Sequence, residues 1–389
     1  MATTSKIRVA ILFGGKSAEH EVSLKSAYNV LAALDPEKYE PVLIGIGKDG
    51  VWRSTGIRRL PGRLELPPTL EESAATSPGV SSQGSGSHAS AEASAELSLA
   101  LGARDLQISG IGPIAAIGAV DVVFPVLHGP YGEDGSVQGL LKLANVPFVG
   151  PGVLGSAVGM DKDVMKRLLR DAGIGIANFR TFLAHERPSI VYEDLIAVLG
   201  SPLFIKPANL GSSVGISKVS SRDELPTALD KAFRFDRKIV IEAAVVGREI
   251  EVAVLGNEAP KASVPGEVIS NAANHGFYSY EAKYLDEKGA ALVIPADLPP
   301  EKAAEIRGLA IQTYQTLCCE GMARVDFFLQ PDGTVLVNEI NTIPGFTAVS
   351  MYPKLWEATG LSYGELLSEL IQLAMRRFEA ESGLATSVS

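Results

Sequence analysis

The sequence predicts a mixed fold, in which an α/β unit with a parallel sheet is followed by α+β units. At the start of the chain an apolar strand-like run over 7–13, a helical pattern over 22–34 and a second apolar run over 39–46 follow one another. This order is typical of parallel sheets, which bind ligands at the carboxyl ends of their strands. Later, apolar runs on both sides of a Gln-Pro-Asp-Gly turn at 330–333 predict an antiparallel hairpin.

The first unit is expected to span 1–150. A strand over 120–127, a helix over 136–144 and a short strand over 146–149 continue its pattern. Before them, the segment at about 60–105 is rich in Ser, Ala, Gly and Pro and has too few large apolar residues to build a core. We interpret this low-complexity segment as a surface insertion, part of it mobile.

The second unit is expected over 151–243 and the third over 244–389. The second begins with an amphipathic helix that Gly173 ends. The third contains the hairpin, whose two strands are expected over 323–329 and 334–340. The amphipathic helix is expected over 161–172. The other elements expected in these two units are a helix over 301–319 and strands over 202–206, 238–243 and 249–255.

Composition excludes two classes of partner. The net charge is −10 and no block of Lys and Arg occurs, whereas nucleic-acid-binding surfaces carry a basic patch, so we expect no nucleic-acid partner. No apolar run approaches the roughly 20 residues that span a bilayer. Residues 1–6 also lack the apolar core of a signal peptide. We therefore expect no membrane insertion and a cytoplasmic location.

A dense group of polar residues follows the strand over 120–127. The segment 128–139 holds His128, Glu133, Asp134 and four glycines within twelve residues. Glycines let a backbone approach a ligand closely, and side chains at a strand's carboxyl end can orient a polar substrate. A tight loop whose acidic residues only favour the start of the next helix is an equally good interpretation of this motif taken alone.

Three glycine-rich segments could bind phosphate, and two of them are poor candidates. The segment 14–17 resembles the end of a P-loop, but the earlier glycine that a P-loop needs falls on Ala10, inside a strand. The segment 150–155 has GxGxxG spacing, but Asp171, about 20 residues later, lies at a helix end where a strand-end carboxylate is needed. We interpret this second segment as a hinge between domains.

The third segment, 206–217, is the better phosphate candidate. Lys206 ends a strand, and the small hydroxyl residues after it lie between two glycines. One fixed positive charge with several backbone and hydroxyl donors suits a polyphosphate. A plain flexible hairpin loop is the alternative. We favour the phosphate role because a lysine within an apolar strand needs an anionic partner.

The hairpin carries a candidate metal site. Glu339 and Asn341 are two apart on a strand and face the same side, and the turn places Asp326 across from about 338 or 339. Two carboxylates about 4 Å apart repel by roughly 4 kcal/mol at an effective dielectric near 20, so a cation or a strong pKa shift must accompany them. Oxygen ligands without thiolate or histidine favour Mg²⁺ over zinc. The alternative, an exposed polar face, is weakened by the apolar residues between the ligands.

Two further loops carry polar groups. The backbone amides of the turn over 342–351 could hold an oxyanion or a carboxylate. The segment 275–284 is polar, aromatic and glycine-bearing, as a lid over a nucleotide would be. Taken alone, this segment is better interpreted as a surface loop.

Together these segments resemble the D-alanine:D-alanine ligases of the ATP-grasp superfamily. The resemblance covers nearly the whole chain except about 60–105, and it rests on segments that occur in family order: 13–24, 128–139, 160–162, 206–215, 281–284, 324–326 and 338–350. It implies an ATP-grasp fold behind an N-terminal parallel-sheet domain, and a ligation in two steps. The carboxylate of one D-alanine attacks the γ-phosphate of ATP, and the amine of a second D-alanine then attacks the acyl phosphate.

The resemblance also implies a role for each matching residue. Glu21 would hold the ammonium of the first substrate, in a hydrogen-bonded group with Ser212 and Tyr284 that closes the lid. Binding of ATP is implied for Lys162, Lys206, Ser213, Glu242, Glu249 and Lys283. An oxyanion hole is implied for Arg324 and the Gly345 amide, a place in the lining of the substrate site for His128, and contact with the second substrate's carboxylate for Ser350 and Met351. Two Mg²⁺ or Mn²⁺ ions would be held by Asp326, Glu339 and Asn341.

The chain departs from the family pattern at two positions. His20 stands where many members have arginine, and Leu210 where many have an acidic residue. Members that prefer D-lactate usually lack the tyrosine at Tyr284, so its presence favours an amine nucleophile. The alternatives are a ligase with D-lactate or D-serine as second substrate, and a non-catalytic nucleotide-binding regulator. The resemblance further implies a homodimer.

Overall fold

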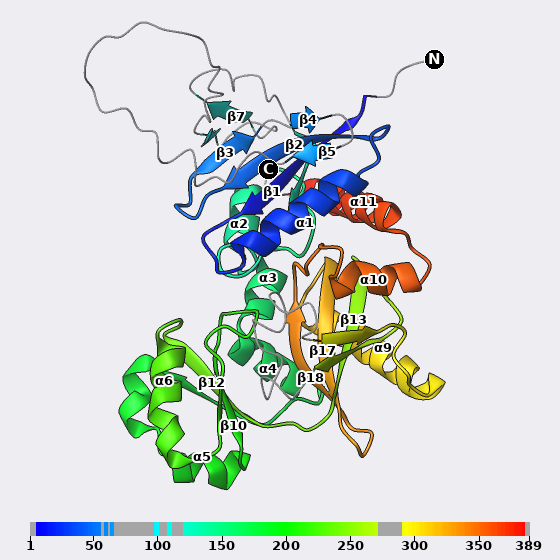
Figure 1. Ribbon diagram of the computed structural model, residues 1–389. Coiled ribbons are helices and arrows are strands. Elements are labelled where there is room, and N and C mark those ends of the chain that lie inside the picture. Colours follow the sequence, from blue (N-terminus) through cyan, green and yellow to red (C-terminus); the bar gives the residue numbers. More distant parts are fainter. Residues whose placement is uncertain are drawn as a thin grey trace, which may run out of the picture.

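The computed structural model describes residues 5–55, 58–60, 63–65, 97–100, 107–110, 120–270 and 290–385. Figure 1 shows the N-terminal sheet at one end of the molecule and two further sheets at the other. No helix among the described residues is long and apolar enough to cross a bilayer.

The N-terminal sheet is parallel at its centre, as predicted. Its strand order is β3-β2-β1-β8, in which β1 pairs with β2 and β8 in parallel and β3 is an antiparallel edge. Its elements are β1 (Ile7–Gly14), α1 (His20–Ala33), β2 (Tyr39–Ile46), β3 (Trp52–Thr55), β8 (Val122–Pro125) and α2 (Ser136–Leu143).

The strand predicted over 146–149 is wrong. Only an isolated bridge joins Val123 to Phe148. Pro147 precedes that bridge and has no N–H to continue the ladder.

Within the insertion the structure describes two small antiparallel pairs, β4–β5 and β6–β7. Their bounds are β4 (Arg58–Leu60), β5 (Arg63–Glu65), β6 (Leu97–Ala100) and β7 (Gln107–Gly110). The rest of the predicted insertion lies outside the described residues.

A central antiparallel sheet of order β11-β10-β12-β9 follows two helices. The side chain of Asp161 caps the second helix by accepting from the N–H groups of Asp163 and Val164, both at 3.1 Å, and Gly173 ends it with φ +75°. The elements are α3 (Val153–Met160), α4 (Lys162–Asp171), β9 (Phe179–Leu183), the 3₁₀ turn Ala184–Ser189, α5 (Tyr192–Leu199), β10 (Leu203–Pro207), β11 (Ser217–Val219), the 3₁₀ turn Arg222–Glu224, α6 (Leu225–Phe233) and β12 (Lys238–Ala243).

The third sheet is also antiparallel, with the order β16-β15-β13-β17-β18 and β14 paired to β13. Strands β17 and β18 form the predicted hairpin, and Gly333 in its turn has φ +88°. The elements are β13 (Arg248–Gly256), β14 (Lys261–Ala262), β15 (Gly266–Ser270), β16 (Ala290–Val293), α9 (Pro300–Thr316), β17 (Gly321–Leu329), β18 (Val335–Asn341), α10 (Met351–Ala358) and α11 (Tyr363–Ser382).

Hydrophobic packing joins parts of the chain that are distant in sequence. One core includes residues of β1, α1, β13, β17 and α11, and Figure 1 shows α1 and α11 side by side. A second core includes Met165 and Leu169 of α4 together with residues of β13, β17 and α9. The central sheet has a separate core with α5 and α6. The boundaries at 150 and 243 stay a prediction; the packing places α4 against the third sheet.

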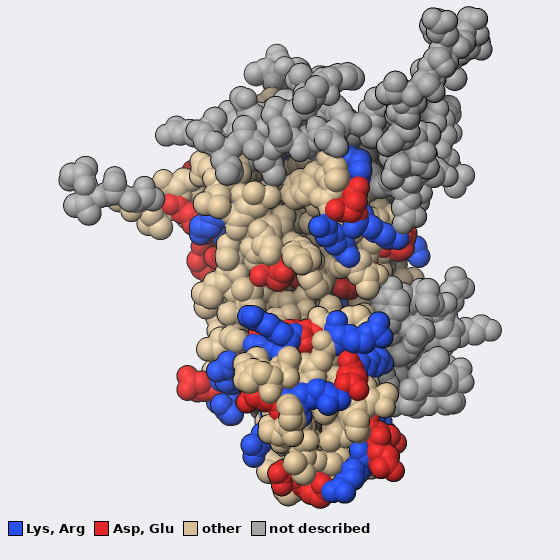
Figure 2. All heavy atoms as spheres, turned by 90° about the vertical axis from the view of Figure 1, so that its left-hand side faces the viewer, with Lys and Arg blue, Asp and Glu red and all other residues tan. Residues whose placement is uncertain are grey.

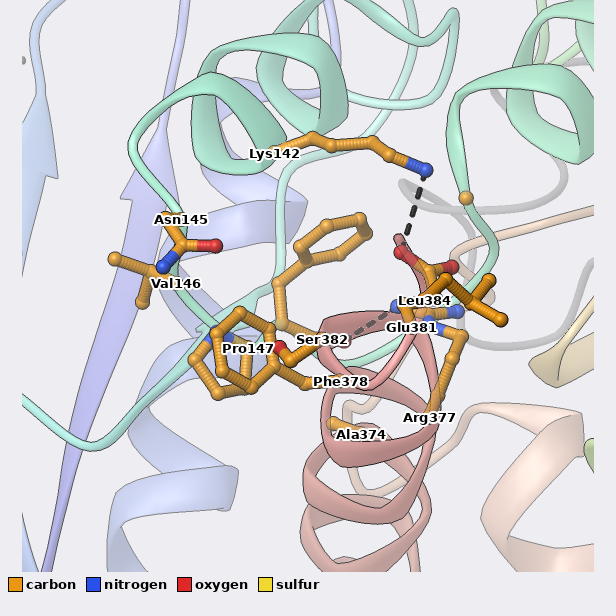
Figure 3. A pocket seen from close by; sticks show the side chains of 12 residues that line it. Lys142, Asn145, Val146, Pro147, Ala374, Arg377, Phe378, Glu381, Ser382 and Leu384 are labelled. Atoms are coloured by element: carbon orange, nitrogen blue, oxygen red, sulfur yellow. Dashed lines mark hydrogen bonds and ion pairs between the residues drawn. The ribbon is translucent and has the colours of Figure 1, made fainter. Parts of the chain in front are cut away.

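The segment predicted as a hinge is fastened to α11. Gly150 has φ +94°, and its carbonyl accepts a hydrogen bond from Arg377 at 2.7 Å. Arg377 also donates to the Phe148 carbonyl at 2.8 Å. The adjoining cavity has a volume of about 620 Å³ and is lined by Gly152, Lys142 and residues of α11. Figure 3 shows Lys142 and the α11 side chains around it. None of the predicted site residues that the structure describes lines this cavity.

Candidate active site

The loops that follow β1 and β8 meet because these strands are neighbours in the sheet. Ser17 Oγ, in the first loop, donates to the carbonyl of His128 in the second at 2.6 Å. Ser23 of α1 accepts from the Gly14 N–H at 2.8 Å and donates to the Val126 carbonyl. These bonds fix the carboxyl-end edge of the sheet, where the strand order predicted a ligand site.

The expected link between Glu21 and Ser212 is wrong, because Ser212 Oγ donates to Glu19 instead. Glu19 immediately precedes α1, and its carboxylate reaches the loop of the central sheet. Glu21 lies in the first turn of α1, where its side chain is 62% exposed and forms an ion pair with Lys48 at 3.4 Å. Two residues along a helix correspond to a rotation of roughly 200°, so Glu19 and Glu21 point to opposite sides.

His128 is buried, with contacts at both ring nitrogens. Nδ1 lies 3.0 Å from the Ile343 carbonyl and 3.5 Å from Glu133 Oε1, and Nε2 lies 3.3 Å from Ser26 Oγ. Burial lowers the pKa of His128, but the Glu133 carboxylate outweighs burial and raises that pKa above its ordinary value. For Glu133, burial raises the pKa to about 7; His128 opposes this shift and the charge of Glu19 adds to it.

Both interpretations of the 128–139 segment therefore describe part of it. Asp134 shapes the turn before α2, because its carboxylate accepts from the N–H groups of Tyr131 at 2.8 Å and Ser136 at 2.9 Å. Glu133 instead faces His128 in the interior. One acidic residue is structural, and its neighbour belongs to the candidate site.

The loop after β10 has a backbone in the left-handed region. Ser212, Ser213 and Gly215 have φ of +51°, +58° and +76°. A Cβ added at Gly215 would lie 2.7 Å from Pro207 Cγ, so glycine is required there. This unusual backbone brings Ser212 to Glu19, and so joins the central sheet to the N-terminal unit.

Lys162, at the start of α4, joins this loop to the hairpin. Its ammonium donates to the Leu210 carbonyl at 2.6 Å and lies 3.4 Å from Glu339 Oε2. Lys162 is only 6% exposed. A buried positive charge between the loop and a carboxylate is a suitable place for an anionic group.

Lys206 has the anionic partner that its apolar strand required. Its ammonium donates to Glu242 at 2.8 Å and to Asn338 Oδ1 at 3.4 Å. Lys166 of α4 lies 3.2 Å from the other oxygen of Glu242. Burial would raise the pKa of Glu242, but the charges of Lys166 and Lys206 lower it to about 2. Lys206 thereby contacts both the central and the third sheet.

The three predicted metal ligands converge on the hairpin. Asp326 lies directly opposite Glu339 in the strand register, as the turn predicted, and Asn341 Nδ2 donates to Asp326 at 3.0 Å. Arg324 makes two hydrogen bonds to the Asp326 carboxylate, both at 2.7 Å, and lies 2.8 Å from Glu251. Among the described residues no group of three or more His, Cys, Asp and Glu side chains could hold a metal. The predicted set has two carboxylates and an amide oxygen.

The turn after β18 is closely packed. A Cβ on Gly345 would lie 2.7 Å from Ser350 Oγ, and Ser350 Oγ accepts from the Thr347 N–H at 3.0 Å. Ser350 precedes α10, whereas the side chain of Met351 is buried in the core that joins the N-terminal and third sheets. Met351 can therefore offer a ligand only its backbone amide, at the amino end of the helix.

The remaining predicted residues give less information. Glu249 lies near the start of β13 and pairs with Phe328 across the sheet. Tyr284 and Lys283, with the whole predicted lid over 275–284, lie outside the described residues.

Surface charge is mixed on the face shown in Figure 2, where Lys and Arg alternate with Asp and Glu and no basic stripe crosses the described part of that face. The three lysines of the candidate site, Lys162, Lys166 and Lys206, are buried.

The sequence interpretation gave no role to four residues of this site: Glu19, Lys166, Glu251 and Asn338. A signal for Glu19 existed, because the helical period places Glu21 in phase with Lys25 and Tyr28, which are exposed. Lys166 also had a signal, since it follows Lys162 by one helical turn.

Comparisons with known proteins agree with this geometry. The family model described as D-ala D-ala ligase N-terminus matches residues 8–151, and the model described as D-ala D-ala ligase C-terminus matches residues 168–372. A D-alanine–D-alanine ligase of Shouchella clausii is 49% identical over 99% of this chain and 99% of its own. The solved D-alanine-D-alanine ligase of Coxiella burnetii is 36% identical with a TM-score of 0.80, covering 97% of each chain. A D-Ala:D-Ser ligase from Enterococcus faecalis is 33% identical with a TM-score of 0.78, covering 95% of this chain and 100% of its own.

Proposed function

Because the chain belongs to the D-alanine–D-alanine ligase family, we propose that it joins two D-alanines to D-alanyl-D-alanine with conversion of ATP to ADP and phosphate. The product would supply the synthesis of peptidoglycan precursors. The observation that carries the proposal is the contact of Glu19 with Ser212. Through this contact a carboxylate of the N-terminal unit lies beside the segment 206–217, which we propose binds phosphate.

In the first step, Glu19 holds the ammonium of the first D-alanine, with His128 beside it. The substrate carboxylate attacks the γ-phosphorus of ATP, and ADP leaves. Lys162 and Lys206 bind the phosphates, since both ammonium groups lie between the central and third sheets. Ser213 contributes from the same loop, and Glu242 and Glu249 bind the adenosine part. Catalysis here is positioning and charge neutralisation.

In the second step, the amine of the second D-alanine attacks the carbonyl carbon of D-alanyl phosphate. A tetrahedral oxyanion forms, phosphate leaves, and the nitrogen loses a proton. Arg324 and the Gly345 amide stabilise the oxyanion. Ser350 and the amide of Met351 at the amino end of α10 bind the incoming carboxylate. Tyr284 and Lys283 act from the lid over 275–284.

The hairpin suits a divalent cation. Asp326, Glu339 and Asn341 offer oxygen donors from adjacent strands, and in the structure Arg324 and Lys162 already balance the two carboxylates. Mg²⁺ or Mn²⁺, as two ions, would be held by these three residues and would neutralise charge on the ATP phosphates. Glu339→Gln should weaken Mg²⁺ binding in the presence of ADP by roughly tenfold or more, measured by calorimetry, and reduce turnover. Unchanged Mg²⁺ affinity would contradict this assignment.

The enzyme would act in the cytoplasm, where ATP and both substrates are available, and as a homodimer, as the family resemblance implies. A second candidate function is ligation of D-alanine to D-serine. It is favoured by one observation, the similarity to a D-Ala:D-Ser ligase over nearly the full chain.

One experiment separates these functions. Phosphate release is measured with ATP, Mg²⁺ and D-alanine, with L-alanine, and with D-alanine plus D-serine or D-lactate, and products are identified by mass. We expect release that depends on D-alanine and a D-alanyl-D-alanine product in every mixture that contains D-alanine. A dominant D-alanyl-D-serine or D-alanyl-D-lactate product would replace the proposal by the second ligase. Nucleotide binding without D-alanine-dependent release would indicate a regulator.

A further inference from the structure

Lys166 is a buried cation to which the proposed mechanism gives no role. It lies on α4 one turn after Lys162, is 0% exposed, and its ammonium lies 3.2 Å from Glu242 and 5.9 Å from the centre of the Phe179 ring. Burying an ammonium costs several kcal/mol unless a partner compensates. A buried ammonium therefore needs an opposite charge beside it, and for Lys166 that charge is the Glu242 carboxylate.

Glu242 is held from both sides. One of its oxygens faces Lys166 at 3.2 Å, and the other accepts from Lys206 at 2.8 Å. Glu242 is 3% exposed. Two cations on one buried carboxylate leave an excess positive charge, which is available to a further anion.

The two lysines differ in what else they can reach. Lys206 is 9% exposed and also contacts Asn338 of the third sheet, so its ammonium borders the space between the sheets. Lys166 has no exposed surface. A phosphate in that space can draw Lys206 toward itself, whereas Lys166 must stay with Glu242.

We propose that Lys166 is a positioning residue for nucleotide binding, and that its ammonium holds the Glu242 carboxylate in place while Lys206 engages the phosphates of ATP. This inference rests on the proposed function, in which Glu242 contacts adenine. The edge of adenine offers a carboxylate one hydrogen-bond donor group, the 6-amino group. Lys166 therefore acts through Glu242 on the choice of base, without touching the nucleotide.

The test uses Lys166→Met, which keeps most of the apolar part of the side chain and removes its charge. Binding of ADP with Mg²⁺ is measured by calorimetry in the full-length protein without D-alanine, and inosine diphosphate serves as the probe that lacks the 6-amino group. We expect ADP binding to weaken by about tenfold or more, since one partner of a buried pair is lost, while inosine diphosphate binding changes about twofold or less. Lys218→Met, an exposed lysine on β11, is the matched control and should bind both nucleotides like wild type.

A second comparison keeps the test decisive if Lys166→Met folds poorly. Glu242→Gln and the double variant Lys166→Met with Glu242→Gln remove the pair together. If Lys166 acts through Glu242, the double variant should bind ADP within about threefold of Glu242→Gln alone. In active enzyme, Lys166→Met should raise KM for ATP and leave KM for D-alanine within about twofold. Equal losses for both nucleotides, or losses that add fully in the double variant, would overturn the proposal. Because binding is measured without turnover, failure of the ligase function would appear separately, as absent D-alanine-dependent phosphate release in wild type.

Discussion

Glu133 and Glu242 are both carboxylates of the candidate site with little exposure, 13% and 4% of the side chain, yet their pKa values move in opposite directions. Glu133 lies 3.5 Å from His128 and near the charge of Glu19, and burial raises its pKa to about 7. Glu242 lies between Lys166 and Lys206, and these charges lower its pKa to about 2 against the effect of burial.

The difference shows that burial decides the pKa of Glu133, whereas two neighbouring cations overcome the effect of burial at Glu242. The charges of Lys166 and Lys206 keep Glu242 ionised over the whole physiological range. Glu133 faces a histidine, which is itself titratable, and its carboxyl group gains and loses a proton near pH 7. The nucleotide end of the site therefore has a fixed charge, and the amino-acid end exchanges protons.

The largest expected effect comes from removing the charge of Glu242. Glu242→Gln leaves Lys166 and Lys206 facing each other without their shared anion, and the free energy of unfolding at pH 7 should fall by about 3 kcal/mol. Chemical denaturation measures this change. Glu133→Gln is the matched control, because Glu133 is partly neutral at that pH, and it should cost about 1 kcal/mol or less. Equal losses in the two variants would mean that burial alone governs both sites.

A smaller effect should appear in the pH dependence of stability. A pKa raised to about 7 in the folded protein means that the folded state keeps a proton that the unfolded state loses near its ordinary value of 4.5. The raised pKa of His128 acts in the same direction. Stability from this pair is thus complete below about pH 4.5 and is lost as pH rises through 7. The lowered pKa of Glu242 makes its contribution constant above pH 4.5.

Glu133→Gln should therefore reduce the fall in stability of wild type between pH 5 and pH 8 by an amount on the order of 1–2 kcal/mol. Denaturation at both pH values, in wild type and the variant, isolates this difference. A fall of the same size in Glu133→Gln and wild type would exclude Glu133 as its origin.

The smallest effect is expected at an exposed carboxylate. The Glu193 side chain pairs with Arg222 at 2.6 Å, and the hydrogen bond from Arg222 lowers the pKa of Glu193. Solvent screens this pair, so Glu193→Gln should leave Tm and KM for ATP at their wild-type values. A large drop in Tm would show that this exposed ion pair stabilises the fold as much as a buried pair does.

The metal hairpin was predictable to within one residue, because a four-residue turn sets the register of the strands that it connects. The turn at 330–333 placed Asp326 opposite 338 or 339, and the structure has it opposite Glu339. A shift of register between Asp326 and Phe327, which the sequence did not predict, moves the pairing from 338 to 339.

The N-terminal loop was not predicted to the residue. Glu19 and Glu21 are two apart at the start of α1, and the family resemblance assigned the substrate carboxylate to Glu21 without considering the phase of the helix. Helix starts are poorly determined by sequence, and an error of two residues reverses the direction of a side chain. Lys25 and Tyr28 are exposed, and the helical period places Glu21 on the same exposed face of α1.

The cluster around Glu242 could be predicted only in part. The strand containing Lys206 indicated a need for an anion, but its partner lies on another strand and Lys166 on a helix. Contacts between elements distant in sequence depend on how the sheets pack. Periodicity within one element carries no information about them.

The most direct test of the central claim, that the substrate site lies where Glu19 meets Ser212, compares Glu19→Gln with Glu21→Gln. Kinetics of D-alanine-dependent phosphate release, with the dipeptide identified by mass, are measured for both variants and wild type. We predict that Glu19→Gln lowers kcat/KM for D-alanine by roughly 100-fold or more, as expected for the loss of a charged contact of about 3 kcal/mol, and that Glu21→Gln stays within about twofold of wild type. A large loss in Glu21→Gln with near-normal activity in Glu19→Gln would contradict the account.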